Sequence, residues 1–510
     1  MTGQVTEIKD PAGACTCYEY DILGRRSRIY NNDGLEVRYG YDALNRISRI
    51  HYGNGVETAY TYDGDGNISS LETKAGENVL LSFAYQYDGN GNRTAKTGIQ
   101  AGAASGGIIS GTTVGNNALD ISYSYDIRGQ LLEERRNGAP VCYAYDKAGN
   151  RIKKTDAQGA TIYHFNRKNQ LITKENTDGR NEFTYDRQGG IVEERNPMGT
   201  RRFSYNSRHQ QARVETENGN VQENRYDAEN LRFELLENGR RTGFVYHNGE
   251  LLHEEGREGQ EVSYHLGLGI DAFQRGEELS YYHRDEQLST ALISGGQGEI
   301  RNSYQYDAFG VQPEAAEQPH NRIRYTGQQY DDLTGQYYLR ARFYNPVLGR
   351  FMQEDSYWGD GLNLYAYCGN NPVVYYDPSG YAKNKKCVQE NHGDNSNAGE
   401  SPALTTSPYN PDTVEQRIKP DYAPNPAHDS HSSSYNTHKT PEPIDAASVY
   451  NNAVRGGMGE WYGVNEQGEI YQFFYDNDGG VHFAGIITKS DLLNKNSSIL
   501  SILGLSPKGK

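Results

Sequence analysis

The chain has 510 residues, which at roughly 100–200 residues per domain predicts several domains. With 51 basic and 67 acidic side chains, its formal net charge of −16 argues against a surface wholly devoted to nucleic acid or an anionic membrane. Only 35% of the residues are hydrophobic, yet 42 are Tyr and 58 are Gly. Tyr covers sheet faces and Gly permits tight turns, so this composition favours a large β-structure rich in hairpins over a helical bundle.

The N-terminal segment MTGQVTEIKDPAG has no apolar core, so we expect no signal peptide. The sequence contains no run of about 18 apolar residues, so we also expect no membrane-spanning helix. The cysteines are odd in number and scattered, which predicts neither a disulfide framework nor a zinc site. Cys15 and Cys17 are closer in sequence than zinc ligands usually are.

Tyr-Asp pairs recur along the first half of the chain. They begin at Tyr20, Tyr41 and Tyr62, and from Tyr125 to Tyr246 the register returns every 20 or 21 residues. Where Tyr-Asp is missing, the register holds Phe165-Asn166, Tyr205-Asn206 or Tyr246-His247. A fixed period of this kind predicts a repeat architecture.

Each repeat reads as Tyr-x-Tyr-Asp, a few turn residues and a short alternating run, as in YSYDIRGQLLEERRNG. Tyr-x-Tyr places two rings on one face of a strand, and Asp followed by Gly is typical of a turn. One repeat cannot bury a core, so we expect stacked repeats to form a long antiparallel sheet that winds as a spiral. The Tyr-Asp pairs are interpreted as structural. Residues 99–119 break the period and are predicted to be a loop or insertion.

These repeats resemble the YD repeats of the Rhs and teneurin-like family. The resemblance implies that residues 1–322 form a β-cocoon, a hollow shell. Residues 323–382 resemble the Rhs-repeat-associated core segment, through YTGQQYDDLTGQYYLRARFYNPVLGRF, GLNLYAYCGNNPV and DPSG in that order. This second resemblance implies a plug that closes the shell, followed by self-cleavage after the DPSG element, with the cut after Tyr381.

In relatives a pair of aspartates, helped by an arginine, makes this cut. The candidates here are Asp355, Asp360 and Asp377, with Arg350 as the helper. Asp360 with Asp377 is the preferred pair, because Asp377 lies in DPSG and Asp360 opens the preceding DGLNLY element. Asp355 stays open as a partner, since Ser356 stands where relatives often have Pro. The alternative is that these aspartates only cap turns.

The composition changes after Ala382. Residues 383–415 are predicted to be a linker, and residues 416–510 a small α+β domain. We expect a helix over 444–455, a strand over 459–464, a hairpin formed by 469–475 and 480–487, and a last helix over 489–503. The resemblance to Rhs proteins implies that the chain beyond the plug is a variable toxin domain, released from the shell by the cut.

Polar residues that could perform acid–base chemistry gather in this tail. His428 and His431 lie in AHDSH, and His438 and Lys439 follow in NTHKTPEP. Histidine titrates near neutral pH and a cation stabilises charge on a phosphate, so the tail could be a metal-independent ribonuclease. The further candidates for the same site are Arg455 and His482.

The same AHDSH motif could instead hold a divalent metal, with Asp429 beside the two histidines, although no cofactor is required by the pattern. Residues 383–510 carry 11 basic and 15 acidic side chains, without the basic stripe of most nucleic-acid enzymes. A polar loop is the alternative interpretation of AHDSH, and a hydrogen-bonded core residue that of His482.

The sequence as a whole predicts a bacterial polymorphic toxin of the Rhs type used in interbacterial competition, with a nuclease effector that acts on RNA in the target cytoplasm. The resemblance implies secretion or delivery from the cell surface by dedicated machinery, and an immunity protein as partner. The alternatives are a non-enzymatic YD-repeat surface or adhesion protein, and an orphan remnant of recombination.

Overall fold

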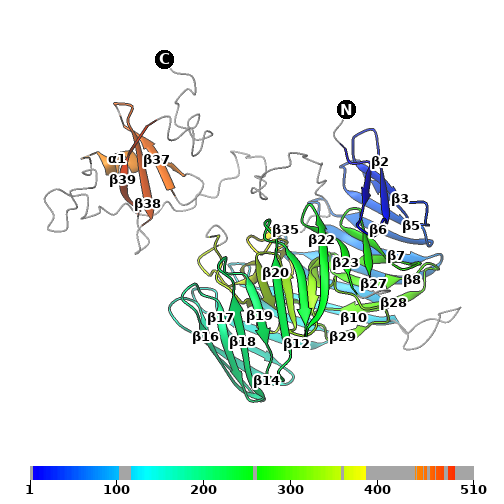
Figure 1. Cartoon of the computed structure of the whole chain (residues 1–510), viewed down its shortest axis with the longest axis horizontal. Coiled ribbons are helices and arrows are strands. Elements are labelled where there is room, and N and C mark those ends of the chain that lie inside the picture. The colour runs from blue at the N-terminus through cyan, green and yellow to red at the C-terminus, as the bar shows by residue number, and fades with distance from the viewer. Residues whose placement is uncertain are drawn as a thin grey trace. The chain divides into compact units, whose positions relative to one another are not determined.

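The computed structural model describes residues 4–102, 116–256, 261–357 and 361–385, and in the tail 443, 445–451, 453–455, 460–465, 467–475 and 481–488. The chain divides into two compact units, Met1–Ser401 and Pro402–Lys510 (Figure 1).

The first unit is built on a 29-stranded antiparallel sheet in which each strand pairs with its neighbours in sequence. Its first half consists of β1 (Glu7–Lys9), β2 (Cys15–Tyr20), β3 (Arg26–Tyr30), β4 (Glu36–Tyr41), β5 (Ile47–Tyr52), β6 (Val56–Tyr62), β7 (Ile68–Ala75), β8 (Asn78–Tyr87), β9 (Arg93–Ala101), β10 (Asn116–Tyr125), β11 (Leu131–Arg136), β12 (Ala139–Tyr145), β13 (Arg151–Asp156) and β14 (Gly159–Phe165). Its second half consists of β15 (Leu171–Asn176), β16 (Gly179–Tyr185), β17 (Ile191–Asn196), β18 (Gly199–Tyr205), β19 (Gln211–Glu215), β20 (Val221–Tyr226), β21 (Arg232–Glu237), β22 (Arg240–His247), β23 (Glu250–Glu255), β24 (Val262–Leu266), β25 (Ile270–Arg275), β26 (Glu278–Arg284), β27 (Thr290–Ser294), β28 (Ile300–Gln305) and β29 (Glu314–Ala316).

The Asp of the repeat holds the turn between two strands. In the first repeat, Asp21 Oδ1 accepts hydrogen bonds from the backbone N–H groups of Leu23 and Arg25, and Gly24 between them has a positive φ of 77°. The same arrangement returns at Asp42, Asp63, Asp88, Asp126 and Asp146, with Asn45 in place of Gly after Asp42. Asp accepts from its own following backbone and Gly tolerates the left-handed conformation, so the motif specifies the turn as predicted.

The two Tyr residues of the repeat have different roles. The first, such as Tyr143, is buried on the core face. The second follows a bulge in the strand, and its hydroxyl donates to the backbone carbonyl of the first residue of the preceding strand: Tyr145 to Leu131 at 2.9 Å, Tyr185 to Leu171 at 3.1 Å and Tyr205 to Ile191 at 2.8 Å. Each repeat is therefore tied to the repeat before it.

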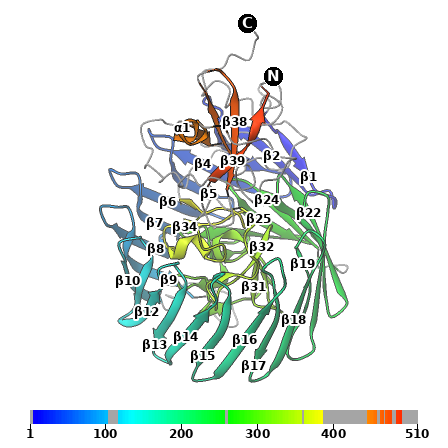
Figure 2. The same ribbon diagram turned by 90° about the vertical axis from the view of Figure 1, so that its left-hand side faces the viewer.

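The sheet curves around the segment that carries the short strands β31, β32 and β34 (Figure 2). Early and late strands pack together, since Val37 and Tyr52 share a core cluster with Ala272 and Tyr281. The middle strands β14–β19 pack on the enclosed segment, through Tyr338, Phe343 and Met352 among other residues. The mainly β architecture with a curved repeat sheet is thus confirmed.

The enclosed segment contains a four-stranded antiparallel sheet, a two-stranded pair and short 3-10 turns. Its elements are a 3-10 turn (Tyr325–Gly327), β30 (Gln329–Asp331), β31 (Gln336–Leu339), β32 (Arg342–Asn345), β33 (Arg350–Phe351), a 3-10 turn (Tyr367–Asn370), β34 (Tyr375–Tyr376) and β35 (Asn384–Lys385).

One buried ion pair connects the enclosed segment to the surrounding repeat sheet. Arg232 of β21 bonds Asp331 of β30 at 2.6 Å, and both side chains are wholly buried. Arg322 adds a second contact to the same carboxylate at 3.3 Å.

The predicted loop or insertion at 99–119 is wrong at its two ends, which are strands. Strands β9 and β10 extend into it and pair up to Ala101 with Asn116, while residues 103–115 lie outside the described residues. Backbone pairing with the neighbouring strand extends the sheet despite a composition typical of loops.

The tail unit contains α1 (Ala446–Asn451), β36 (Val454–Arg455), β37 (Glu460–Val464), β38 (Ile470–Tyr475) and β39 (Val481–Ile487). The predicted strand and hairpin are present. The predicted helix over 444–455 is too long, because Val454 and Arg455 pair with Tyr462 and Trp461 as a strand. The predicted helix over 489–503 lies outside the described residues.

Candidate active site

Two aspartates and one arginine lie close together near the C-terminal end of the enclosed segment. Arg342 begins β32, Asp355 follows β33, and Asp377 follows β34 directly. One guanidinium nitrogen of Arg342 lies 2.7 Å from Asp355 Oδ2 and 3.6 Å from Asp377 Oδ2. All three side chains are at most 6% exposed. Two buried carboxylates thus share one cation.

Asp377 organises the DPSG turn. Its Oδ1 accepts hydrogen bonds from the backbone N–H of Gly380 at 2.8 Å and of Ser379 at 3.1 Å. Strands β34 and β35 pair on either side, with Tyr376 opposite Asn384. The predicted scissile bond, after Tyr381, therefore lies in a loop whose two ends are held together.

The same loop is fixed against the turn between β31 and β32. The backbone N–H of Ala341 donates to the Ser379 carbonyl at 3.1 Å, and Arg342 Nε donates to the Gly380 carbonyl. Gly380 has a φ of 75°, and a Cβ there would lie only 2.4 Å from the Leu339 carbonyl oxygen. Only glycine fits this conformation and this contact.

Arg342 is itself rigidly placed. Its guanidinium lies over the Phe351 ring, 3.5 Å from the centroid, and donates to the Leu364 carbonyl at 3.0 Å. The Asp355 backbone N–H donates to the same carbonyl at 3.1 Å. Burial raises the pKa of Tyr381 and the Asp355 charge raises it further, while the Arg342 charge opposes this rise.

The structure brings Asp377 and Asp355 together, while Asp360, the preferred partner in the sequence, lies outside the described residues. Arg350 lies elsewhere: it donates to the Asn169 carbonyl at 2.6 Å and stacks on Phe165 and Tyr365. Sequence reasoning missed Arg342.

Arg342 lies in the motif YYLRARFYNP, which also contains Arg340. Only the fold shows which of these arginines contacts the aspartates. Arg340, two residues earlier, turns to Glu250 at 2.6 Å.

Most candidate residues of the tail cannot be placed. His428, Asp429, His431, His438 and Lys439 lie outside the described residues. The backbone puts Arg455 in β36 opposite Trp461, and His482 in β39 opposite Phe474. The tail site therefore stays a prediction.

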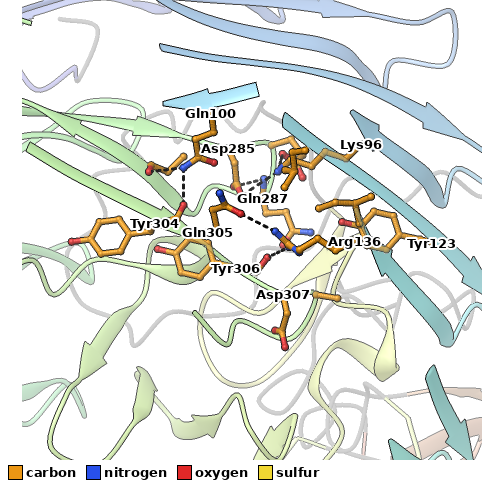
Figure 3. Close-up of a pocket in the computed structure, with 15 residues that line it drawn as sticks. Lys96, Gln100, Tyr123, Arg136, Asp285, Gln287, Tyr304, Gln305, Tyr306 and Asp307 are labelled. Carbon is orange, nitrogen blue, oxygen red and sulfur yellow. Dashed lines mark hydrogen bonds and ion pairs between the residues drawn. The ribbon is translucent and has the colours of Figure 1, made fainter. Parts of the chain in front are cut away.

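A cavity of about 30 Å³ lies inside the shell beside Lys96, Glu286, Tyr306 and Asp307 (Figure 3). Two lining cations are paired, with Lys96 Nζ 2.9 Å from Glu286 Oε2 and Arg136 3.2 Å from Glu134. Burial and the neighbouring Glu134 raise the pKa of Asp307 to about 6. The cavity has room for a water molecule or two, so we interpret it as a polar junction of the wall rather than as a substrate site.

The fold defines a class: a curved antiparallel YD-repeat sheet that encloses its own C-terminal core segment. The family model for the teneurin YD-shell matches residues 105–373, more than half of the chain, and the model for the RHS repeat matches residues 41–79. The chain therefore belongs to the teneurin YD-shell family, as an Rhs-type YD-repeat protein.

The relatives include nucleases and toxins. The tRNA3(Ser)-specific nuclease WapA of Bacillus spizizenii is 35% identical over 170 residues, which are 31% of this chain and 7% of that protein. The toxin protein Tse5 of Pseudomonas aeruginosa is 36% identical over 106 residues, 20% of this chain and 8% of the relative. The chain thus spans less than a tenth of the length of these relatives.

Among solved structures, the TcdB2-TccC3-Cdc42 crystal structure superimposes with a TM-score of 0.60 at 19% identity, over 74% of this chain and 21% of that one. This likeness concerns the fold. Among the residues that the structure describes, no helix has the length and apolar character needed to cross a membrane.

Proposed function

We propose that the chain is the shell and effector portion of a polymorphic toxin that cuts itself between Tyr381 and Ala382. The observation that carries this proposal is the convergence of Asp355, Asp377 and Arg342 on the tightly held DPSG loop.

The arrangement suits aspartyl-type hydrolysis. When two carboxylates are buried beside a single cation, ionising both leaves one negative charge uncompensated, so one can hold a proton while the other accepts one from water. In the proposed step, the ionised carboxylate removes a proton from water, the water attacks the Tyr381 carbonyl, and the protonated carboxyl donates to the departing amide nitrogen of Ala382. Because the loop is fixed at both ends, its confinement supplies much of the rate enhancement.

The first test is the integrity of the purified chain. The unaltered protein is expected to yield two fragments, the smaller beginning at Ala382 by mass spectrometry. Asp355→Asn and Asp377→Asn each remove one half of the acid–base pair and should slow the cut by roughly 100-fold or more.

Two further variants sharpen this test. Asp332→Asn, at a half-exposed carboxylate that pairs with Arg324, is the matched control and should leave cleavage unchanged. Asp360→Asn distinguishes the pair favoured by the sequence from the pair in the structure, and cleavage should persist in it. Unimpaired cutting in both Asp355→Asn and Asp377→Asn would refute the assignment.

We further propose that the released tail is a nuclease, with RNA as the favoured substrate, delivered to competing bacteria and neutralised in the producer by an immunity protein. The nuclease relative supports this substrate class, and the Rhs-type shell supports delivery. Any metal would be held by His428, Asp429 and His431.

Expression of residues 383–510 in a bacterium tests the effector. Growth arrest with degraded RNA, reversed in the His431→Ala variant, is the expected result. Arrest with intact RNA and DNA would exclude a nuclease, and normal growth with a folded product would exclude a toxic tail.

A further inference from the structure

The first hairpin of the sheet gathers two thiols and a carboxylate on one face. In the register of β1 and β2, Glu7 lies opposite Cys17, and Lys9 opposite Cys15. Cys15 and Cys17 alternate with the buried Thr16, so both thiols point away from the core face and are only half buried. The strand period thus brings together residues that the sequence separates.

The distances suit a thiophilic divalent cation. The two sulfur atoms are 3.7 Å apart, and one carboxylate oxygen and both sulfurs lie within 4.8 Å of one another. Two thiolates bound to Zn²⁺ at about 2.3 Å in tetrahedral geometry are about 3.8 Å apart. The two thiols therefore already have the spacing that this geometry demands.

A disulfide suits the same pair less well. Extended strand geometry separates the Cα atoms of residues i and i+2 by about 6.7 Å, close to the upper limit of about 6.8 Å for a disulfide. Bringing the sulfurs to bonding distance would strain β2, whereas a bound cation leaves them where they are.

The charge is also balanced. Two thiolates and one carboxylate carry three negative charges, of which Zn²⁺ cancels two. Lys9 lies beside the cluster, with its ammonium 3.0 Å from Glu7 Oε1, and offsets the third. The thiols release their protons to solvent as the cation binds, and no redox step occurs.

We propose that Cys15, Cys17 and Glu7 bind one Zn²⁺ ion, with a water molecule as fourth ligand on the solvent side. The ion would bridge β1 to β2 at the edge of the sheet. The end of β1 is already attached to the late strands, because Asp10 Oδ2 bonds His253 Nδ1 at 2.9 Å and also accepts from Ser263. The ion would hold β1 and β2 together on the solvent-facing side of the same hairpin.

The test uses the full-length, reduced, metal-free protein and Co²⁺ as a spectroscopic probe, followed by Zn²⁺ competition. Thiolate-to-cobalt charge-transfer bands should appear at one equivalent and vanish when Zn²⁺ is added. Cys17→Ser should abolish these bands. Glu7→Gln, at an exposed position that folding tolerates, should weaken Zn²⁺ binding by roughly 10–100-fold.

Two controls separate this site from others in the chain. Cys142→Ser removes a half-buried thiol that also faces a carboxylate, Glu133 at 3.6 Å. His431→Ala removes a candidate ligand of the tail. Both variants should keep the charge-transfer bands. Bands that are absent from the unaltered protein, or that survive Cys17→Ser, would overturn the proposal.

Discussion

A single hydroxyl explains why the second aromatic position of the repeat is Tyr. Tyr145 donates to the Leu131 carbonyl, and its equivalents make the same bond along the sheet, whereas Phe165 occupies this register without a hydroxyl. Tyr145→Phe should therefore lower the free energy of unfolding by about 1 kcal/mol, measured by denaturant titration. Phe165→Tyr is the reciprocal variant and should raise it by up to the same amount. An unchanged free energy of unfolding in Tyr145→Phe would contradict this role of the hydroxyl.

Residue-level chemistry also sets how much of the candidate site the sequence could reveal. The aspartates stand in a recognisable motif, so Asp355 and Asp377 were among the candidates. The arginine could not be chosen, because Arg340, Arg342 and Arg350 lie within eleven residues and the turn between β31 and β32 sends the first two to different partners. The Cys15–Cys17–Glu7 cluster was missed for a similar reason, because the register that places Glu7 opposite Cys17 is known only from the folded structure.

At the scale of elements, alternation and turn residues were sufficient to predict the strands of the repeats and the hairpin of β38 and β39. They failed where pairing overrides local preference. Val454 and Arg455 continue a helical pattern in sequence, but β37 offers them a strand partner. Likewise β9 and β10 extend beyond their expected ends because each is the other's partner.

The attachment of β30 to β21 is expected to be sensitive to substitution, because it rests on a wholly buried ion pair. Asp331→Asn leaves the wholly buried Arg232 without its charged partner, and breaking a buried pair from one side costs about 3–5 kcal/mol. We expect a lower melting temperature in calorimetry and earlier proteolysis of the segment around residues 323–385. Asp332→Asn, at the next residue and half-exposed, should change neither measurement.

For the whole molecule, buried histidines predict a loss of stability in acid. Burial lowers the pKa of His265 to about 4 and of His283 to about 3, so both are neutral in the folded chain and charge only on unfolding. Between about pH 4 and 6.5 the unfolded chain binds more protons at these two sites, and stability rises with pH. Asp307, with its pKa raised to about 6, opposes this in part because the folded chain holds that proton.

The net expectation is about 1 kcal/mol of stability lost per pH unit on acidification across this window. Thermal unfolding at several pH values measures it. His283→Gln removes one of the two titrating rings and should flatten the dependence. A stability that increases on acidification would contradict the predicted sign.

The pairing of β34 with β35 would make release of the tail a separate step from cleavage of the chain after Tyr381. If the proposed cut between Tyr381 and Ala382 is made, it would open only the loop, because Tyr375 and Tyr376 pair with Lys385 and Asn384 beyond it. Such a nicked protein would migrate as one particle in a native gel and as two chains in detergent. The tail would then leave only when the hydrogen bonds between β34 and β35 break. Separation of these two strands, rather than hydrolysis, would therefore set the timing of release.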